Sequence, residues 1–284
     1  MHTLMVSLFT AQLALAADPM PDELPPPPTM QVLTTAGGAR FGLFGEKPTK
    51  PAPTLFIFAQ SLENMVKNVY FIEVGRRLAL YGFLYVVVDP PCHGVDSKPG
   101  EPPELRGWRY RVENNEALVA PFTTRATAVL DHLVTEGYTD PAQVAACGTS
   151  RGGFLALQFA AAEPRVRAVV AISPVTDLAA LSEFKGLGDH PNVVALKAEN
   201  LAEKLAGRPV WISIGNNDRR VDTDDAIATT RKFTAAGVAK AAGVTNPVIP
   251  VELIVGRSPG HGSIDGAYEL AAEWLLRQVE TPQR

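Results

Sequence analysis

The sequence predicts an α/β protein with a doubly wound, mostly parallel sheet, helices on both faces and no large cap domain. Apolar runs alternate along the chain with segments of helical character, which is the order of elements in such a sheet. Each run is continuously apolar, as expected of parallel strands that are covered on both faces. The stretch 174–208 between two of these runs has room for one or two helices only, which is too little for a large cap.

The expected strands follow from the apolar runs, and the expected helices from the segments between them. Strands are predicted at 54–59, 83–89, 143–148, 166–173, 209–215 and 248–256. Helices are predicted at 63–81, 120–137, 151–162 and 223–240. A last helix is predicted where apolar residues repeat with helical spacing, at Ala267, Leu270, Ala271, Trp274 and Leu275. Ahead of the first run, Gly37-Gly38 indicates a hairpin in the stretch that starts at Met30.

The N-terminal part of the chain predicts export to the periplasm or the medium. Residues 1–17 have the pattern of a signal peptide, with an apolar stretch that is too short to span a bilayer and ends in A-x-A. Because no Lys or Arg precedes that stretch, a cytoplasmic protein with an apolar extension is the alternative. We expect residues 18–29, which include four consecutive prolines, to form a linker. Residues 30–284 are expected to form one domain. After cleavage of the signal peptide we expect no contact with the membrane.

Composition excludes several classes of function. A net charge of −4 without a dense Lys/Arg stripe argues against nucleic-acid binding. No cluster of His, Cys and carboxylate residues has the spacing of a metal site, and no G-x-G-x-x-G opens a first strand–helix unit. We therefore expect neither a metal nor another cofactor.

A serine between glycines is the first candidate functional residue. The stretch Gly148-Thr149-Ser150-Arg151-Gly152 lies between a predicted buried strand and a predicted helix. This is the setting of a nucleophile elbow, in which a sharp turn exposes the serine at the carboxyl edge of the sheet. The alternative is a serine that only caps a buried helix.

An acid and a histidine follow the serine at the positions that a catalytic triad requires. A nucleophile of this type works with a carboxylate and then a histidine further along the chain. Asp218 follows the strand predicted at 209–215, and His261 follows the last predicted strand. Rival acids are close in sequence, at Asp222, Asp224 and Asp225. We prefer Asp218 because it stands three residues after Gly215.

These motifs, together with "DPPCHGVDS" at 89–97 and "ISPVTDL" at 172–178, resemble the α/β-hydrolase superfamily. Within it they are similar to the prolyl-oligopeptidase-like and dienelactone-hydrolase-like branches. The resemblance implies that 30–284 is an α/β-hydrolase domain with Ser150 as nucleophile, His261 as general base and then acid, and Asp218 as the orienting carboxylate. It also implies an oxyanion hole with the Arg151 N–H as one donor. The second donor is Gln60 or Ser61, and the sequence does not decide between them.

The resemblance bears on the two cysteines and on several conspicuous side chains. In the family's strand order Cys92 and Cys147 belong to strands about 10 Å apart, beyond the roughly 7 Å between Cα atoms that a disulfide allows. We expect both to be reduced.

The Arg151 side chain has two interpretations. It either pairs with a surface carboxylate or, as the resemblance to glucuronoyl esterases implies, faces an acidic sugar or a polarised carbonyl. His93 and His132 are interpreted as structural. The stretch 106–112, "RGWRYRV", is expected to be a loop before a helix, either as a buried anchor with solvated arginines or as a substrate contact.

The sequence therefore predicts a cofactor-free serine hydrolase that cleaves an ester or a related acyl bond. Its expected partner is a small-molecule or carbohydrate ester. One alternative is a peptidase of the prolyl-oligopeptidase type, which is less favoured because 284 residues leave no room for that family's N-terminal propeller. The other is a non-catalytic ligand-binding protein on the same fold.

Overall fold

The computed structural model describes residue 21 and residues 23–280, apart from the side chain of residue 280. The predicted signal peptide at 1–17 lies outside this part of the chain. The described part of the predicted linker has no regular secondary structure, and it lies against the domain. Arg76 and Arg77 donate hydrogen bonds to the backbone oxygens of Pro25 and Pro21, over 2.7 Å and 3.2 Å.

The described residues contain a mixed sheet of eight strands in the order β1-β2-β4-β3-β5-β6-β7-β8. The strands are β1 (Gln31–Thr34), β2 (Arg40–Phe44), β3 (Ala52–Phe58), β4 (Leu84–Val87), β5 (Thr139–Thr149), β6 (Val166–Ile172), β7 (Val210–Gly215) and β8 (Val251–Gly256). The pairs β1–β2 and β2–β4 are antiparallel, and all other neighbours are parallel. The predicted fold class is confirmed.

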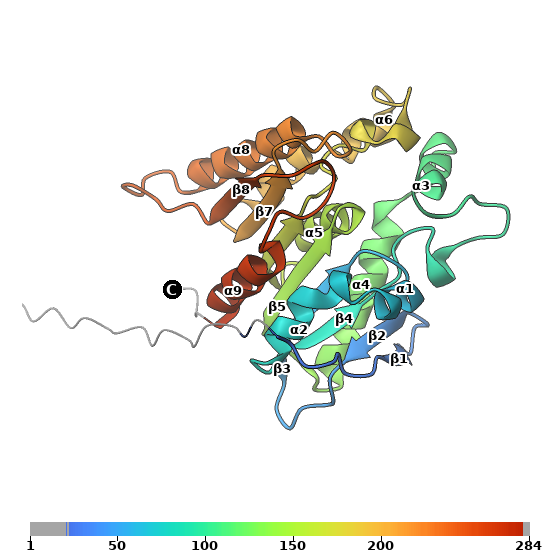
Figure 1. Cartoon of the computed structure of the whole chain (residues 1–284), viewed down its shortest axis with the longest axis vertical. Helices are drawn as coiled ribbons and strands as arrows, with labels where there is room; N and C mark the ends of the chain where they lie inside the picture. Colours follow the sequence, from blue (N-terminus) through green and yellow to red (C-terminus); the bar gives the residue numbers. More distant parts are fainter. Residues whose placement is uncertain (1–20, 22, 281–284) are drawn as a thin grey trace, which may run out of the picture.

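Helices cover both faces of the sheet. They are α1 (Leu62–Lys67), α2 (Glu73–Ala79), α3 (Glu104–Glu113), α4 (Val119–Thr135), α5 (Arg151–Ala162), α6 (Pro191–Ala195), α7 (Ala202–Leu205), α8 (Thr223–Lys240) and α9 (Ala267–Glu280). Short 3-10 turns are η1 (Val69–Ile72), η2 (Gly94–Asp96), η3 (Leu178–Ala180), η4 (Ser182–Phe184) and η5 (Ala198–Leu201). Helices α2 and α9 lie side by side over one core cluster, whereas α4, α5 and α8 contribute to the other (Figure 1).

The short elements between β6 and β7 add no large cap, as predicted. Within the described residues we find no helix with the length and apolar character that crossing a bilayer requires.

Cys92 and Cys147 are buried and unpaired, as predicted, and burial raises the pKa of the Cys92 thiol to about 12. Burial raises the pKa of the Cys147 thiol as well, so both thiols stay protonated near neutral pH.

Most predicted elements differ from the structure by a few residues in their bounds, and the strand predicted at 143–148 begins earlier, at Thr139. Two further differences have a local cause. The helix predicted at 63–81 is divided into α1, η1 and α2, because Asn68 leaves the helical region with φ −127° and ψ 85°. Asparagine favours such breaks because its side chain competes for backbone hydrogen bonds. The last strand begins at Val251 rather than at residue 248, directly after Pro250, which has no N–H to offer to a ladder.

The stretch 106–112 is a helix, which corrects the prediction of a loop. Within α3, Trp108 and Arg111 share one buried face, and the Trp108 indole N–H donates to the oxygen of Pro91 over 2.7 Å. The expectation of solvated arginines is wrong for Arg111. Its guanidinium is 2.7 Å from Asp96 and 2.5 Å from Glu101, and the side chains of Arg111 and Glu101 are only 4% and 3% exposed.

We expect Arg111→Met to lower the free energy of unfolding by about 3 kcal/mol, because it leaves the Glu101 carboxylate buried without its cation. The hydrogen bond from Arg111 is the main reason that the pKa of Glu101 lies below its usual range. The difference in free energy of unfolding between the wild type and the variant should have its full size above the ordinary glutamate pKa of about 4.3. This difference should shrink as the pH falls toward the lower pKa that Glu101 has in the folded wild type, because Glu101 then becomes neutral in both proteins. Urea unfolding at several pH values measures this, with Lys98→Met, from the exposed Lys98–Glu116 pair, as a nearly neutral control.

Candidate active site

Ser150 occupies a strained turn between β5 and α5. Its φ of 56° and ψ of −118° lie in a region that residues other than glycine rarely adopt. The backbone N–H of Ser150 donates to the oxygen of Ile172 at the end of β6 over 2.8 Å. The turn therefore holds the serine at the carboxyl edge of the sheet, where ligands of open α/β sheets bind.

Two glycines around the serine allow this turn to form. A Cβ on Gly152 would lie 1.7 Å from the Phe58 oxygen, and a Cβ on Gly148 would lie 2.1 Å from the Gly152 oxygen. Neither position has space for any side chain. The start of α5 is thus packed directly onto the backbone of β3 and β5.

The structure brings Ser150, His261 and Asp218 into one chain of hydrogen bonds. The Ser150 Oγ is 2.9 Å from the His261 Nε2, and the His261 Nδ1 is 2.8 Å from the Asp218 Oδ2. The three residues follow β5, β8 and β7 respectively, at the same edge of the sheet. The Asp218 side chain is fully buried, whereas that of His261 is 29% exposed.

The environment of Asp218 favours its charged form. Burial by itself would raise the pKa of Asp218, but the hydrogen bond and charge of His261 and the N–H groups of Val221 and Arg220 outweigh it and leave the pKa below its ordinary value. The rival acids Asp222, Asp224 and Asp225 lie at the start of α8. Asp222 caps α8 by accepting hydrogen bonds from the N–H groups of Asp224 and Asp225.

The sequence-based oxyanion candidates lie around the start of α5. Arg151 is its first residue, and the Arg151 Nε donates to the oxygen of Ala59 over 3.1 Å, which places Gln60 and Ser61 next to the serine turn. Asp89, buried two residues after the end of β4, accepts the N–H of Leu62 over 2.8 Å and so fixes the far end of this loop. The choice between Gln60 and Ser61 as the second donor stays a prediction.

Comparison with known proteins supplies the family. The family model described as "Dienelactone hydrolase family" matches residues 42–242. This chain belongs to the dienelactone hydrolase family. A search of curated protein sequences finds no significant match.

Solved structures similar to this dienelactone hydrolase family member show the same fold at low identity. A protein from Thermus thermophilus is 22% identical, with 89% of this chain and 99% of that chain covered and a TM-score of 0.66. A glucuronoyl esterase from Teredinibacter turnerae is 18% identical, with 88% and 73% covered and a TM-score of 0.54. An acylaminoacyl peptidase from Pyrococcus horikoshii is 14% identical, with 90% and 42% covered and a TM-score of 0.65.

A pocket of about 340 Å³ includes Arg151, the residue after Ser150, in its lining. It is lined by Pro103, Glu104, Leu105, Arg106, Arg151, Glu183 and Arg220. Arg151 is 2.8 Å from Glu104, and Arg220 is 2.6 Å from Glu183, so two ion pairs belong to its wall.

His93 is buried, and its Nδ1 lies 2.7 Å from the oxygen of Pro91. His132 packs edge-on against Phe41.

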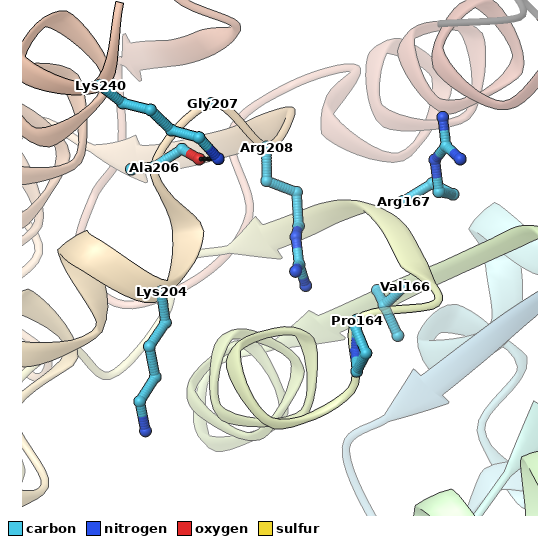
Figure 2. A pocket seen from close by; sticks show the side chains of 8 residues that line it. All are labelled: Pro164, Val166, Arg167, Lys204, Ala206, Gly207, Arg208 and Lys240. Carbon is cyan, nitrogen blue, oxygen red and sulfur yellow. Dashed lines mark hydrogen bonds between the residues drawn. The ribbon is translucent and has the colours of Figure 1, made fainter.

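A second pocket, of about 240 Å³, lies at the opposite edge of the sheet, near the start of β6 and β7 (Figure 2). Its cationic side chains are those of Arg167, Lys204, Arg208 and Lys240. In Figure 2 the Lys204 and Arg208 side chains extend in a similar direction and Arg167 in the opposite one, with their charged ends apart, so these cations do not converge on one point. Among the described residues, no group of three or more His, Cys, Asp or Glu could hold a metal ion.

Sequence reasoning missed two residues that contact the histidine loop, which we define as residues 257–263. The Ser173 Oγ donates to the oxygen of Gly262 over 2.6 Å, and the Tyr70 hydroxyl donates to the Ser263 Oγ over 2.8 Å. Ser173 lies in the stretch 172–178 that contributes to the family resemblance, but the two contacts join residues 89 and 193 positions apart, which that stretch does not indicate.

We expect Gly152→Ala to destabilise the fold by about 3 kcal/mol or more, because the added methyl group meets the backbone of β3 rather than a movable side chain. Chemical unfolding of the purified variant measures this. Gly37→Ala is the matched control, since a Cβ there meets nothing nearer than 3.9 Å. Equal stability of the two variants would contradict the close packing of α5 onto β3.

Proposed function

We propose that this dienelactone hydrolase family member is a serine hydrolase that cleaves carboxylic esters through an acyl-enzyme on Ser150. The observation that carries the proposal is the hydrogen-bonded chain from the Ser150 Oγ through His261 to Asp218. Each contact has the length that proton transfer between positioned groups requires. The order of the three residues in the chain also agrees with that of known hydrolases with a nucleophile elbow.

The proposed reaction begins when the Ser150 Oγ attacks the ester carbonyl and its proton passes to the His261 Nε2. The imidazolium then gives that proton to the leaving alcohol, and a water repeats the sequence to release the acid. Asp218 accepts the Nδ1–H of His261, which selects the tautomer whose Nε2 is free to act as a base. The N–H groups of Arg220 and Val221 keep the carboxylate of Asp218 ionised during this cycle.

The proposed oxyanion hole combines the Arg151 N–H with one donor from Gln60 or Ser61. Arg151 begins a helix of 12 residues, so its N–H belongs to the positive end of the α5 dipole. Donors that are already in place where negative charge develops contribute several kcal/mol to lowering a barrier, about 2.7–4 kcal/mol for one donor.

Acylated carbohydrates and other polar esters are the proposed substrates. The pocket that includes Arg151, the residue after Ser150, has five charged side chains in its lining, carries two ion pairs and is not covered by a large cap. Such walls offer hydrogen-bond partners to hydroxyl groups rather than apolar area to a long acyl chain. A screen of acetylated sugars, methyl uronates and short aryl esters tests this proposal.

Two alternatives to an esterase, a peptidase and a non-catalytic binding protein, can be distinguished by experiment. The similarity to an acylaminoacyl peptidase makes peptide substrates the alternative reaction, although this chain covers 42% of that protein. Relative rates on p-nitrophenyl acetate and a proline naphthylamide separate the two reactions. A non-catalytic binding protein would show neither reaction and would leave Ser150 unlabelled by a fluorophosphonate probe.

We also propose that residues 1–17 direct export, so that the enzyme acts in the periplasm or outside the cell. The support is the apolar stretch with its A-x-A ending. The N-terminal sequence of the protein recovered from cell fractions tests this. A full-length chain in the cytoplasm would refute it.

We expect Ser150→Ala to lower kcat on any ester substrate by at least about 10⁴-fold, because no other group forms the acyl-enzyme. The variant should also resist fluorophosphonate labelling, as followed by mass spectrometry. Its fold should be retained, since alanine adds no atoms to the turn. Residual hydrolysis close to that of the wild type would refute Ser150 as nucleophile.

We expect Asp218→Asn to lower kcat by about 10⁴-fold, because an amide at this position favours the tautomer of His261 that cannot take the serine proton. Asp222→Asn is the matched control. Asparagine can keep the cap of α8 and tolerates the φ of 65° at this position, so kcat should be unchanged. A larger effect at Asp222 than at Asp218 would exchange the two assignments.

A further inference from the structure

Ser173 has an unusual place between the serine turn and the histidine loop. It follows β6, is fully buried, and has a φ of 43°, in the left-handed region. The structure therefore has strained, non-glycine residues after two neighbouring strands, Ser150 after β5 and Ser173 after β6. Strain of this kind persists only where surrounding contacts hold it, and it is concentrated at functional sites.

The backbone around Ser173 holds the serine turn from two sides. The Ser150 N–H donates to the Ile172 oxygen over 2.8 Å, and the Val175 N–H donates to the Ser150 oxygen over 3.1 Å. The Ser173 N–H donates to the Ser213 oxygen on β7 over 2.7 Å. The segment 172–175 is thus fixed to β7 and to both peptide groups of Ser150.

The side chain of Ser173 holds the histidine loop. Its Oγ donates to the oxygen of Gly262, the residue after His261, over 2.6 Å. The loop has few buried side chains of its own, and His261 is partly exposed. Two more hydrogen bonds reach the loop, from the Tyr70 hydroxyl to the Ser263 Oγ and from the Ser258 N–H to the Asn216 Oδ1 over 3.2 Å, but both are exposed and open to competition by water.

We propose that Ser173 is a positioning residue that sets the distance between the His261 Nε2 and the Ser150 Oγ. The inference rests on the proposed serine-hydrolase function. One four-residue segment binds both peptide groups of Ser150, and its Ser173 hydroxyl is the buried contact to the backbone next to His261. A displacement of about 1 Å between reacting groups can lower a rate by about 10²-fold. Loss of this single hydrogen bond should therefore slow the chemical steps without changing the binding of substrate.

The test compares two serines that are equally buried. Ser173→Gly removes the hydroxyl and suits the left-handed backbone, so the fold should be retained. Ser213→Ala removes a fully buried hydroxyl that has no hydrogen-bond partner among the described residues. We expect Ser173→Gly to lower kcat on p-nitrophenyl acetate by about 10–100-fold with KM within about twofold. Ser213→Ala should leave both unchanged.

Hydrogen exchange of residues 257–263 provides a readout that does not depend on activity. We expect exchange in the histidine loop to be faster in Ser173→Gly and unchanged in Ser213→Ala. A wild-type kcat in the folded glycine variant would overturn the proposal, and so would a lowered kcat with unchanged loop exchange. Should the wild-type protein itself hydrolyse no ester, the proposed function fails, while the exchange data still decide whether the hydroxyl holds the loop.

Discussion

The close approach of α5 to β3 and β5 is the constraint on which the rest of the site depends. Because Gly148 and Gly152 carry no Cβ, the helix begins against strand backbone, and the chain between strand and helix must turn within one residue. That residue is Ser150, whose left-handed conformation follows from the lack of space on either side. The same approach brings Arg151 against Ala59, so the helix start and the loop after β3 form one surface.

Buried charges organise the loops at this edge of the sheet. Asp89 accepts N–H groups from Leu62 and Val95, so it joins the loop after β3 to the loop after β4. Asp96 in that second loop contacts both Arg111 of α3 and Arg125 of α4. Isolated buried charges are costly, and these groups are each satisfied by several partners. The edge that carries the candidate site is therefore held by polar contacts, whereas the sheet beneath it is held by apolar packing.

Much of the fold and of the candidate site could be predicted because both depend on local pattern. Continuous apolar runs identify covered parallel strands, and Ser150, Asp218 and His261 each follow one of them directly. Helix α3 was missed because its buried face includes Arg111, whose partners lie in the preceding loop and cannot be recognised from a hydrophobic pattern.

Contacts between distant parts of the chain could not be predicted from the sequence. Ser173 reaches a carbonyl 89 residues away, and the motif at 172–178 that contains it indicates the family but neither this contact nor the conformation of Ser173. The second oxyanion donor depends on where N–H groups point in a loop without glycine, which residue types do not determine.

Asp218 and His261 differ sharply in their exposure to solvent. Asp218 is completely enclosed, while the imidazole of His261 reaches the molecular surface. In the proposed reaction, the anion that stabilises the imidazolium is thus shielded from salt, whereas the group that carries the proton borders bulk water. Water for the second half-reaction can arrive from solvent at the imidazole itself, and the acid released can depart by the same side. Turnover then needs neither an internal water channel nor a moving lid.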